Sequence, residues 1–184
     1  MNSKKTTAII YAFYNRPDAR NNLTFFFQNG YIDVNVDYFV VVNEDATQFN
    51  SRTQILDLIP KRSNISIYFQ ENKGYDFAGY LRGIDEANRI QSYDYYFFLN
   101  ASSRGPYYTS QKQGDTFLQK FQCLLKGDVK LVGPTINVTT WAPVTQGFQC
   151  HQRVPQIFGD RKEVFVEMGQ HDACLFVLWG VRVA

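Results

Sequence analysis

The sequence predicts an α/β fold: one domain with a central, mostly parallel, mixed sheet flanked by helices. Three observations predict it, namely apolar runs of strand length, amphipathic segments of helix length between them, and turn residues at the boundaries. Strand and helix alternate along most of the chain. Because a parallel pair needs a crossover connection, this alternation favours parallel strands joined by right-handed crossovers.

The first half of this alternation ends at Pro60. The apolar run TTAIIYAFY has the pattern of a strand buried on both faces. After it, Pro17 suits the first turn of a helix, Asp18 suits its positive end, and Gly30 suits its stop. VDYFVVVN predicts the next strand and SRTQILDLIP a short helix. The expected elements are strands at 6–14 and 36–43, and helices within 15–30 and 51–60.

The second half continues in the same order. NISIYFQ and YDYYFFLN read as strands, and the segment between them has apolar residues at helical spacing. GDTFLQKFQCLLKG is an amphipathic helix with a glycine stop, and VKLVGPTINV is a strand or a strand followed by a loop. The apolar end, ACLFVLWGVRVA, is either a last buried strand or helix, or the mark of a chain that is truncated or one module of a longer protein. The expected elements are strands at 64–70, 93–100 and 129–138, and helices at 75–90 and 114–127.

Composition and charge exclude several classes of function. The net charge of +2 is spread over interspersed acids and bases, so neither a nucleic-acid stripe nor a polybasic membrane patch is expected. The 3 cysteines form no CxxC pair, which is typical of free thiols in a reducing compartment. No segment has the length of a membrane span, and the first apolar run lacks a signal-peptide cleavage site. These features predict a soluble cytoplasmic protein.

Polar sequences follow each of the first four predicted strands: YNRPD, NED, ENKGYD and NASSRGP. In open α/β sheets, ligands bind outside the carboxyl ends of the strands, near the point where the strand order reverses. Four polar strand ends at one edge predict a polar pocket with apolar walls, which is the general form of a small-molecule site.

Several familiar sites are absent from the sequence. GxGxxG does not follow the first strand, and neither the P-loop GxxxxGK[ST] nor the GxSxG elbow occurs. NAD and ATP bound in the usual ways are therefore not expected. His151 and His171 lie away from clustered carboxylates and cysteines, so a histidine zinc site is not expected either.

Five segments that follow one another over roughly residues 7–140 carry a resemblance to a known family: YAFYNRPD, VVVNE, ENKGYDFAGYLRGID, YDYYFFLNASSRGPY and KLVGPTIN. They resemble GT-A-type glycosyltransferases, which use nucleotide sugars. The resemblance is strongest to the group that includes rhamnan-synthesis-type enzymes and those of large algal viruses. It implies transfer of a hexosyl or deoxyhexosyl group from a UDP-sugar to a glycan or glycoprotein acceptor. Residues 1–140 would bind the nucleotide sugar, and 141–184 would lie on the acceptor side.

The resemblance also implies roles for single residues. Asn43 and Glu44 would face the base or ribose. Asn72 and Asp76 would brace the nucleotide, and Gly74 would permit the tight turn between them. Asp76 could instead be the N-cap of a helix at 77–90. The residues assigned to the nucleotide are Tyr14, Asn15, Arg16, Asn43, Glu44, Asn72, Asp76, Asn100, Ser102 and Arg104.

The sequence departs from the family where Asn100, Ala101 and Ser102 stand in place of the Asp-x-Asp metal signature. Three interpretations remain. Asp76 supplies the carboxylate for Mn²⁺ or Mg²⁺, with Asn100 and Ser102 as weaker or water-mediated ligands; or the site is metal-independent and Arg104 or Arg16 offsets the diphosphate charge; or the domain binds without catalysing. The first is the preferred one.

A catalytic base is expected in the C-terminal third. GQHDAC places His171 and Asp172 together after a glycine, and Glu167 and His151 are further candidates; the alternative for GQHDAC is a solvated turn. Two functions thus stand: a glycosyltransferase, or a non-catalytic nucleotide-sugar or glycan-binding module of a larger protein. A nucleotide-binding α/β protein of unrelated function is a weaker third, because a fold does not fix a function.

Overall fold

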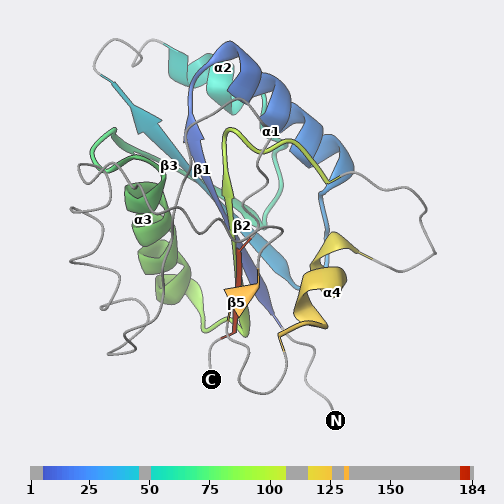
Figure 1. Cartoon of the computed structure of the whole chain (residues 1–184). Coiled ribbons are helices and arrows are strands. Elements are labelled where there is room, and N and C mark those ends of the chain that lie inside the picture. Colours follow the sequence, from blue (N-terminus) through green and yellow to red (C-terminus); the bar gives the residue numbers. More distant parts are fainter. Residues whose placement is uncertain (1–5, 46–50, 107–115, 126–130, 133–178, 183–184) are drawn as a thin grey trace, which may run out of the picture.

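The computed structural model describes residues 6–45, 51–106, 116–125, 131–132 and 179–182 (Figure 1). Strands and helices alternate along the chain as the sequence predicts. The elements are β1 (Thr7–Tyr14), α1 (Pro17–Asn29), β2 (Val36–Glu44), α2 (Arg52–Leu56), β3 (Ile65–Glu71), α3 (Tyr75–Ile90), β4 (Tyr95–Asn100), α4 (Phe117–Gln122), β5 (Leu131–Val132) and β6 (Trp179–Arg182).

The strands form one sheet in the order β3-β2-β1-β4-β6-β5. β3, β2, β1 and β4 are parallel, whereas β6 pairs antiparallel with β4 and β5 pairs antiparallel with β6. The predicted α/β class with a mostly parallel, mixed sheet is therefore confirmed. The order β3-β2-β1-β4 is also the beginning of the Rossmann-type strand order.

Helices cover both faces of the sheet (Figure 1). Ile9, Tyr11 and Phe13 of β1 share a buried core with side chains of α1, α2 and α4. Ala8 and Ile10 point to the opposite face and share a second core with α3. β1 is thus buried on both faces, which explains its continuous apolar run.

Two buried glycines let α3 lie close to β1. A Cβ atom on Gly83 would stand 2.3 Å from Cγ2 of Ile10, and one on Gly79 would stand 3.0 Å from Cβ of Ala12. Four residues apart, the two glycines lie on the same face of the helix. Their missing side chains set the distance between α3 and the sheet, and with it the position of the first turn of α3 at the carboxyl edge.

Several boundaries differ from the predicted ones. β4 begins at Tyr95 and not at residue 93, and the amides of Asp94 and Tyr95 both donate to the carbonyl of Thr6 beside the start of β1. α4 ends at Gln122, before the predicted stop at residue 127, and begins with a capping box on Thr116. Within the stretch predicted as a fifth strand the structure describes 131–132, and within the apolar end it describes the strand at 179–182.

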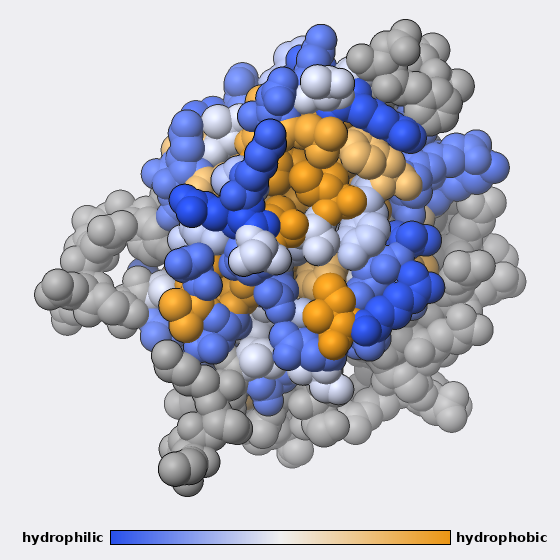
Figure 2. All heavy atoms as spheres, turned by 180° about the vertical axis from the view of Figure 1, so that it is seen from behind, coloured by the Kyte–Doolittle hydropathy of each residue, from blue (hydrophilic) through white to orange (hydrophobic). Residues whose placement is uncertain are grey.

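The described surface is mainly hydrophilic. Figure 2, a view from behind, shows one larger apolar area among polar side chains. None of the described helices has both the length and the apolar character needed to cross a membrane. The large apolar side chains that stand exposed among the described residues are Val34, Leu56, Tyr75, Ile90 and Leu124.

Candidate functional site

The strand order reverses between β1 and β4. From β1 the chain passes through β2 to the sheet edge at β3 and then crosses to β4, on the other side of β1. In sheets of this kind the connections on the two sides of such a point diverge and leave a crevice at the carboxyl ends of the strands. The segments that flank it are residues 14–16, at the end of β1, and residues 100–102, at the end of β4.

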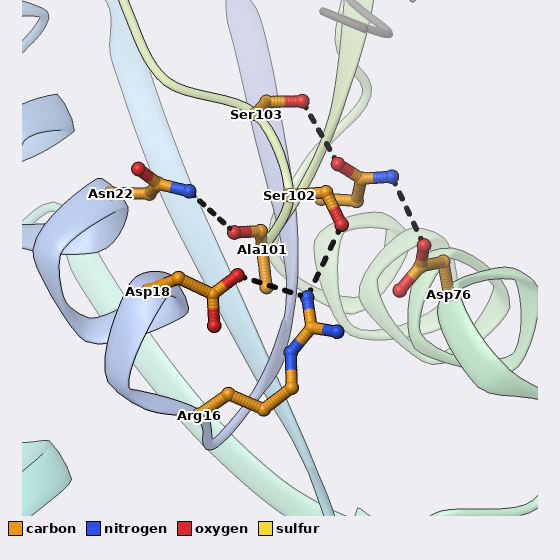
Figure 3. Close-up of polar contacts among 8 residues, drawn as sticks. Arg16, Asp18, Asn22, Asp76, Ala101, Ser102 and Ser103 are labelled. Atoms are coloured by element: carbon orange, nitrogen blue, oxygen red, sulfur yellow. Dashed lines mark hydrogen bonds and ion pairs between the residues drawn. The ribbon is translucent and has the colours of Figure 1, made fainter. Parts of the chain in front are cut away.

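Arg16 spans this point. Its guanidinium lies 3.4 Å from the hydroxyl of Ser102, after β4, and 3.4 Å from the carboxylate of Asp18 (Figure 3). Both distances are at the long end of the range for polar contacts, and the side chain is 48% exposed. Nearby, Asn22 of α1 donates to the carbonyl of Ala101 at 3.0 Å and fixes the end of β4 against α1. The guanidinium of Arg16 is therefore loosely held, whereas α1 and the end of β4 on either side of it are fixed to each other.

A hollow of about 420 Å³ lies beside Arg16, at the first turn of α1, and none of its lining side chains is acidic. Arg20 donates to the side chain of Asn15 at 2.7 Å and to that of Gln54 at 3.1 Å, so its guanidinium is held beside the hollow. Two guanidinium groups and the positive end of a helix favour an anion. The lining residues are Asn15, Arg16, Pro17, Arg20 and Asn21.

Asp76 lies on the other side of the crevice, in the first turn of α3. Its carboxylate accepts a hydrogen bond from the side-chain amide of Asn100 at 3.1 Å, and Asn100 in turn accepts from the hydroxyl of Ser103 at 2.8 Å (Figure 3). Burial raises the pKa of Asp76, while the hydrogen bond from Asn100 and the charge of Arg16 act in the opposite direction. The helix begins at Tyr75 after Gly74 at φ 86°, so the alternative of Asp76 as its N-cap is wrong.

The predicted metal ligands do not complete a divalent-cation site in this arrangement. Both polar atoms of Asn100 are engaged within the protein, and the hydroxyl of Ser102 faces a guanidinium. Only Asp76 brings a negative charge, whereas Mn²⁺ and Mg²⁺ favour several hard anionic oxygens. Nowhere in the described ranges do three acidic, histidine or cysteine side chains gather.

Asn43 and Glu44, at the end of β2, are positioned for structural tasks. Glu44 is fully buried (0% exposed), and its carboxylate accepts two hydrogen bonds of 2.9 Å from Arg52. Asn43, 1% exposed, donates to the carbonyl of Tyr75 at 3.0 Å and accepts from Gln70 at 2.8 Å. The side chains predicted to face the base or ribose are thus turned inward, and the partner of Glu44, Arg52 of α2, is 46% exposed.

The remaining predicted residues divide into three groups. The hydroxyl of Tyr14 donates to the carboxylate of Asp45, and the backbone amide of Asn72 donates to the carbonyl of Glu44 at 2.9 Å; both lie at the carboxyl edge. Arg104 lies 5.0 Å over the ring of Phe25, which is about 12 Å along α1 from Pro17 and so away from the hollow. The candidates for the catalytic base, His151, Glu167, His171 and Asp172, lie outside the described residues.

Sequence reasoning missed Arg20, which lines the hollow, and Tyr75, which is exposed next to Asp76 at the carboxyl edge. For Arg20 a signal exists, because residues four apart on a helix share a face and Arg16 had already been singled out. For Tyr75 the only signal is its place after Gly74. The sequence does not show that Tyr75 itself has a positive φ, of 52°.

We expect Asp76→Asn to gain stability relative to the wild type as the pH rises from 4 to 7. Burial raises the pKa of Asp76 in the folded state, so ionisation is harder there than in the unfolded chain, and the wild type loses stability between the unfolded-state pKa and the folded-state pKa. Asparagine does not ionise and still accepts the hydrogen bond from Asn100. Urea unfolding at pH 4, 5.5 and 7 measures this difference.

The control for this prediction is Asp85→Asn, which removes an exposed carboxylate from the same helix. A stability difference between Asp76→Asn and the wild type that stays constant over this pH range would contradict the assigned burial of Asp76.

No protein-family model matches the sequence, and no curated protein matches it. Among solved structures, a mannosyltransferase from Pyrobaculum calidifontis, in complex with GDP-Man and Mn²⁺, is similar with a TM-score of 0.41 and 15% identity. The similarity covers 58% of this chain and 30% of that one. A similarity of this degree assigns no function to the chain, so the function is inferred from the site itself.

Proposed function

We propose that this chain is a glycosyltransferase that transfers a sugar from a nucleotide-sugar donor, a UDP-sugar in the first instance, to a glycan acceptor. One observation supports the proposal above the others: beside the point where the strand order reverses, Arg16, Arg20 and the first turn of α1 border a hollow with no acidic side chain in its lining. A diphosphate is the part of such a donor that this set of groups would bind.

In glycosyl transfer the protein must position the donor and stabilise the departing diphosphate. In an inverting enzyme it must also remove a proton from the acceptor. Arg16 is suited to the second task. Its loosely held guanidinium is free to move onto phosphate oxygens and to offset the charge that they gain as the glycosidic bond breaks. His171 or Asp172 is proposed as the base.

A divalent cation could bind at Asp76, independently of the two arginines. Asp76 is the carboxylate that would hold Mn²⁺ or Mg²⁺ if one binds, with Asn100 and Ser102 beside it, and the cation would offset diphosphate charge. Because the described donors do not complete such a site, no catalytic step is assigned to the ion. The observed donor set instead favours charge compensation by Arg16 and Arg20.

The second candidate function is a non-catalytic nucleotide-sugar or glycan-binding module. It is favoured by the engagement of Asp76 with Asn100 and by the inward orientation of Glu44, which leave few acidic groups at the crevice. A nucleotide-sugar-binding module would bind the same donor as the enzyme, so turnover separates these two; a glycan-binding module would bind no nucleotide.

The first experiment is thermal unfolding with UDP, GDP, CMP, NAD and UDP-glucose, each with and without Mn²⁺. A ligand at about 100 times its Kd adds roughly 2.7 kcal/mol, which raises the Tm of a domain of this size by about 5–10 °C. We expect such a shift with UDP and UDP-glucose.

Slow release of UDP from UDP-glucose is the matching assay for turnover. Release supports the glycosyltransferase, and binding without release or transfer supports the non-catalytic module. If no nucleotide raises the Tm, the glycosyltransferase and the nucleotide-sugar-binding module are both wrong, and of the two candidates only a glycan-binding module is left. A UDP shift that does not depend on Mn²⁺ would favour arginine over a cation as the partner of the diphosphate.

A further inference from the structure

We infer that Tyr75 is the stacking platform for the nucleobase at this site, an inference that rests on the proposed nucleotide-sugar binding. Tyr75 is 58% exposed, and it is the only aromatic residue among the exposed large hydrophobic side chains of the described part of the chain. Aromatic rings ordinarily bury most of their surface, which makes an exposed one at a crevice a candidate for contact with a ligand.

The backbone at Tyr75 is in a strained conformation. Its φ is 52°, in the left-handed region, directly after Gly74 at 86°. Within the described ranges the other non-glycine residue with positive φ is Asn35, a residue type that adopts this conformation readily, whereas a bulky aromatic is an outlier there. Strain of this kind persists only where surrounding structure imposes it, and it concentrates at ligand-binding positions.

A buried network imposes the conformation. The side-chain amide of Asn43, at the end of β2, donates to the carbonyl of Tyr75 at 3.0 Å. Asn43 is itself held by Gln70 of β3 at 2.8 Å. Two strands are thus used to fix the peptide of a residue whose ring contributes little to the core. Since neither the exposed ring nor its backbone favours the fold, a role in binding accounts for both.

The position fits the same ligand as the cationic hollow. Tyr75 immediately precedes Asp76, whose carboxylate accepts from Asn100 at the end of β4, so both lie at the carboxyl edge that carries Arg16. Among the described residues, no aromatic ring or guanidinium contacts the ring of Tyr75, whereas Arg52 lies 4.7 Å over the ring of Phe69. An uncovered aromatic ring at the same carboxyl edge as an anion site suits a nucleotide, because bases of every kind stack on aromatic rings.

The test compares Tyr75→Asn and Tyr75→Phe with the wild type, using UDP and inorganic pyrophosphate as probes in calorimetric titrations. Asparagine tolerates the left-handed backbone and removes the ring; phenylalanine keeps the ring and loses only the hydroxyl. We expect Tyr75→Asn to bind UDP roughly tenfold more weakly, to bind pyrophosphate as the wild type does, and to unfold at an equal or higher Tm. Tyr75→Phe should bind UDP as the wild type does.

The outcomes separate this inference from the function on which it rests. Unchanged UDP binding by Tyr75→Asn overturns the stacking role while the nucleotide site stands. An equal loss for UDP and pyrophosphate also overturns it, because the ring would then act on the phosphate site and not on the base. If the wild type binds neither UDP nor GDP, the proposed function fails and the stacking role fails with it.

Discussion

Replacing Arg16 with alanine is expected to weaken UDP binding by roughly 10- to 100-fold. This range corresponds to the loss of a charge-assisted hydrogen-bond partner, about 1.5–3 kcal/mol. Among the described residues the guanidinium makes two polar contacts, both of 3.4 Å, with Asp18 and Ser102. Exposed ion pairs of this kind contribute about 0–1 kcal/mol to folding, so the Tm should change little. Calorimetric titration with UDP, together with thermal unfolding, measures both quantities.

Two variants make this prediction specific. Arg16→Lys keeps the charge but lacks the planar fork that holds two phosphate oxygens, and should bind UDP with intermediate affinity. Arg62→Gln removes an exposed arginine that lies over the ring of Tyr31, before β3 and thus toward the opposite edge of the sheet, and should bind UDP normally. Equal losses in Arg16→Ala and Arg62→Gln would show that net charge alone governs binding and would contradict a phosphate site at α1.

Much of the fold could be predicted because its signals are local. The continuous apolar run of β1 marks a strand buried on both faces, and Pro17 with Gly30 marks the ends of α1; the structure confirms both. The boundaries that differ depend on contacts outside the segment. Residue 93 precedes β4 because the amides of the next two residues donate to Thr6, which is remote in sequence. No local pattern encodes such a pairing.

The pairing partners of the antiparallel strands could not be predicted from the sequence for the same reason. Tyr95 pairs with Arg182, and Leu131 pairs with Val181. Partners so far apart along the chain are selected by the assembled sheet. The edge at which the polar strand ends meet was nevertheless predictable, because parallel strands necessarily end on the same side.

The candidate site was predictable by position and less so by side-chain direction. Residues 14–16 and 100–102 do flank the crevice, as expected from strand ends. Asn43 and Glu44 end a strand too, but their side chains turn inward. That of Asn43 is hydrogen-bonded to the carbonyl of Tyr75, and that of Glu44 to Arg52. Such competition among polar groups is decided by tertiary geometry. The strained backbone of Tyr75 is a further case, since it depends on a network that reaches from β2 and β3.

Gly83→Ala is expected to destabilise the protein by about 2 kcal/mol, which lowers the Tm by roughly 4–8 °C. The added methyl would stand 2.3 Å from Cγ2 of Ile10, far inside contact distance. Alanine favours a helix over glycine by about 1 kcal/mol, which opposes the effect but does not exceed it, because the branched side chain of Ile10 is fixed in a central strand with both faces buried. Urea and thermal unfolding measure the change.

Ile10 supplies a matched pair of second-site variants. Ile10→Ala removes both γ-carbons that lie near Gly83, so its combination with Gly83→Ala should cost less than the sum of the two single changes. Ile10→Val keeps both γ-carbons and should give no such relief. If Gly83→Ala is neutral, or if valine relieves it as well as alanine does, then the close approach of α3 to β1 is wrong. The same approach positions the first turn of α3, so Gly83→Ala should also weaken UDP binding, whereas a substitution that merely lowers stability elsewhere should not.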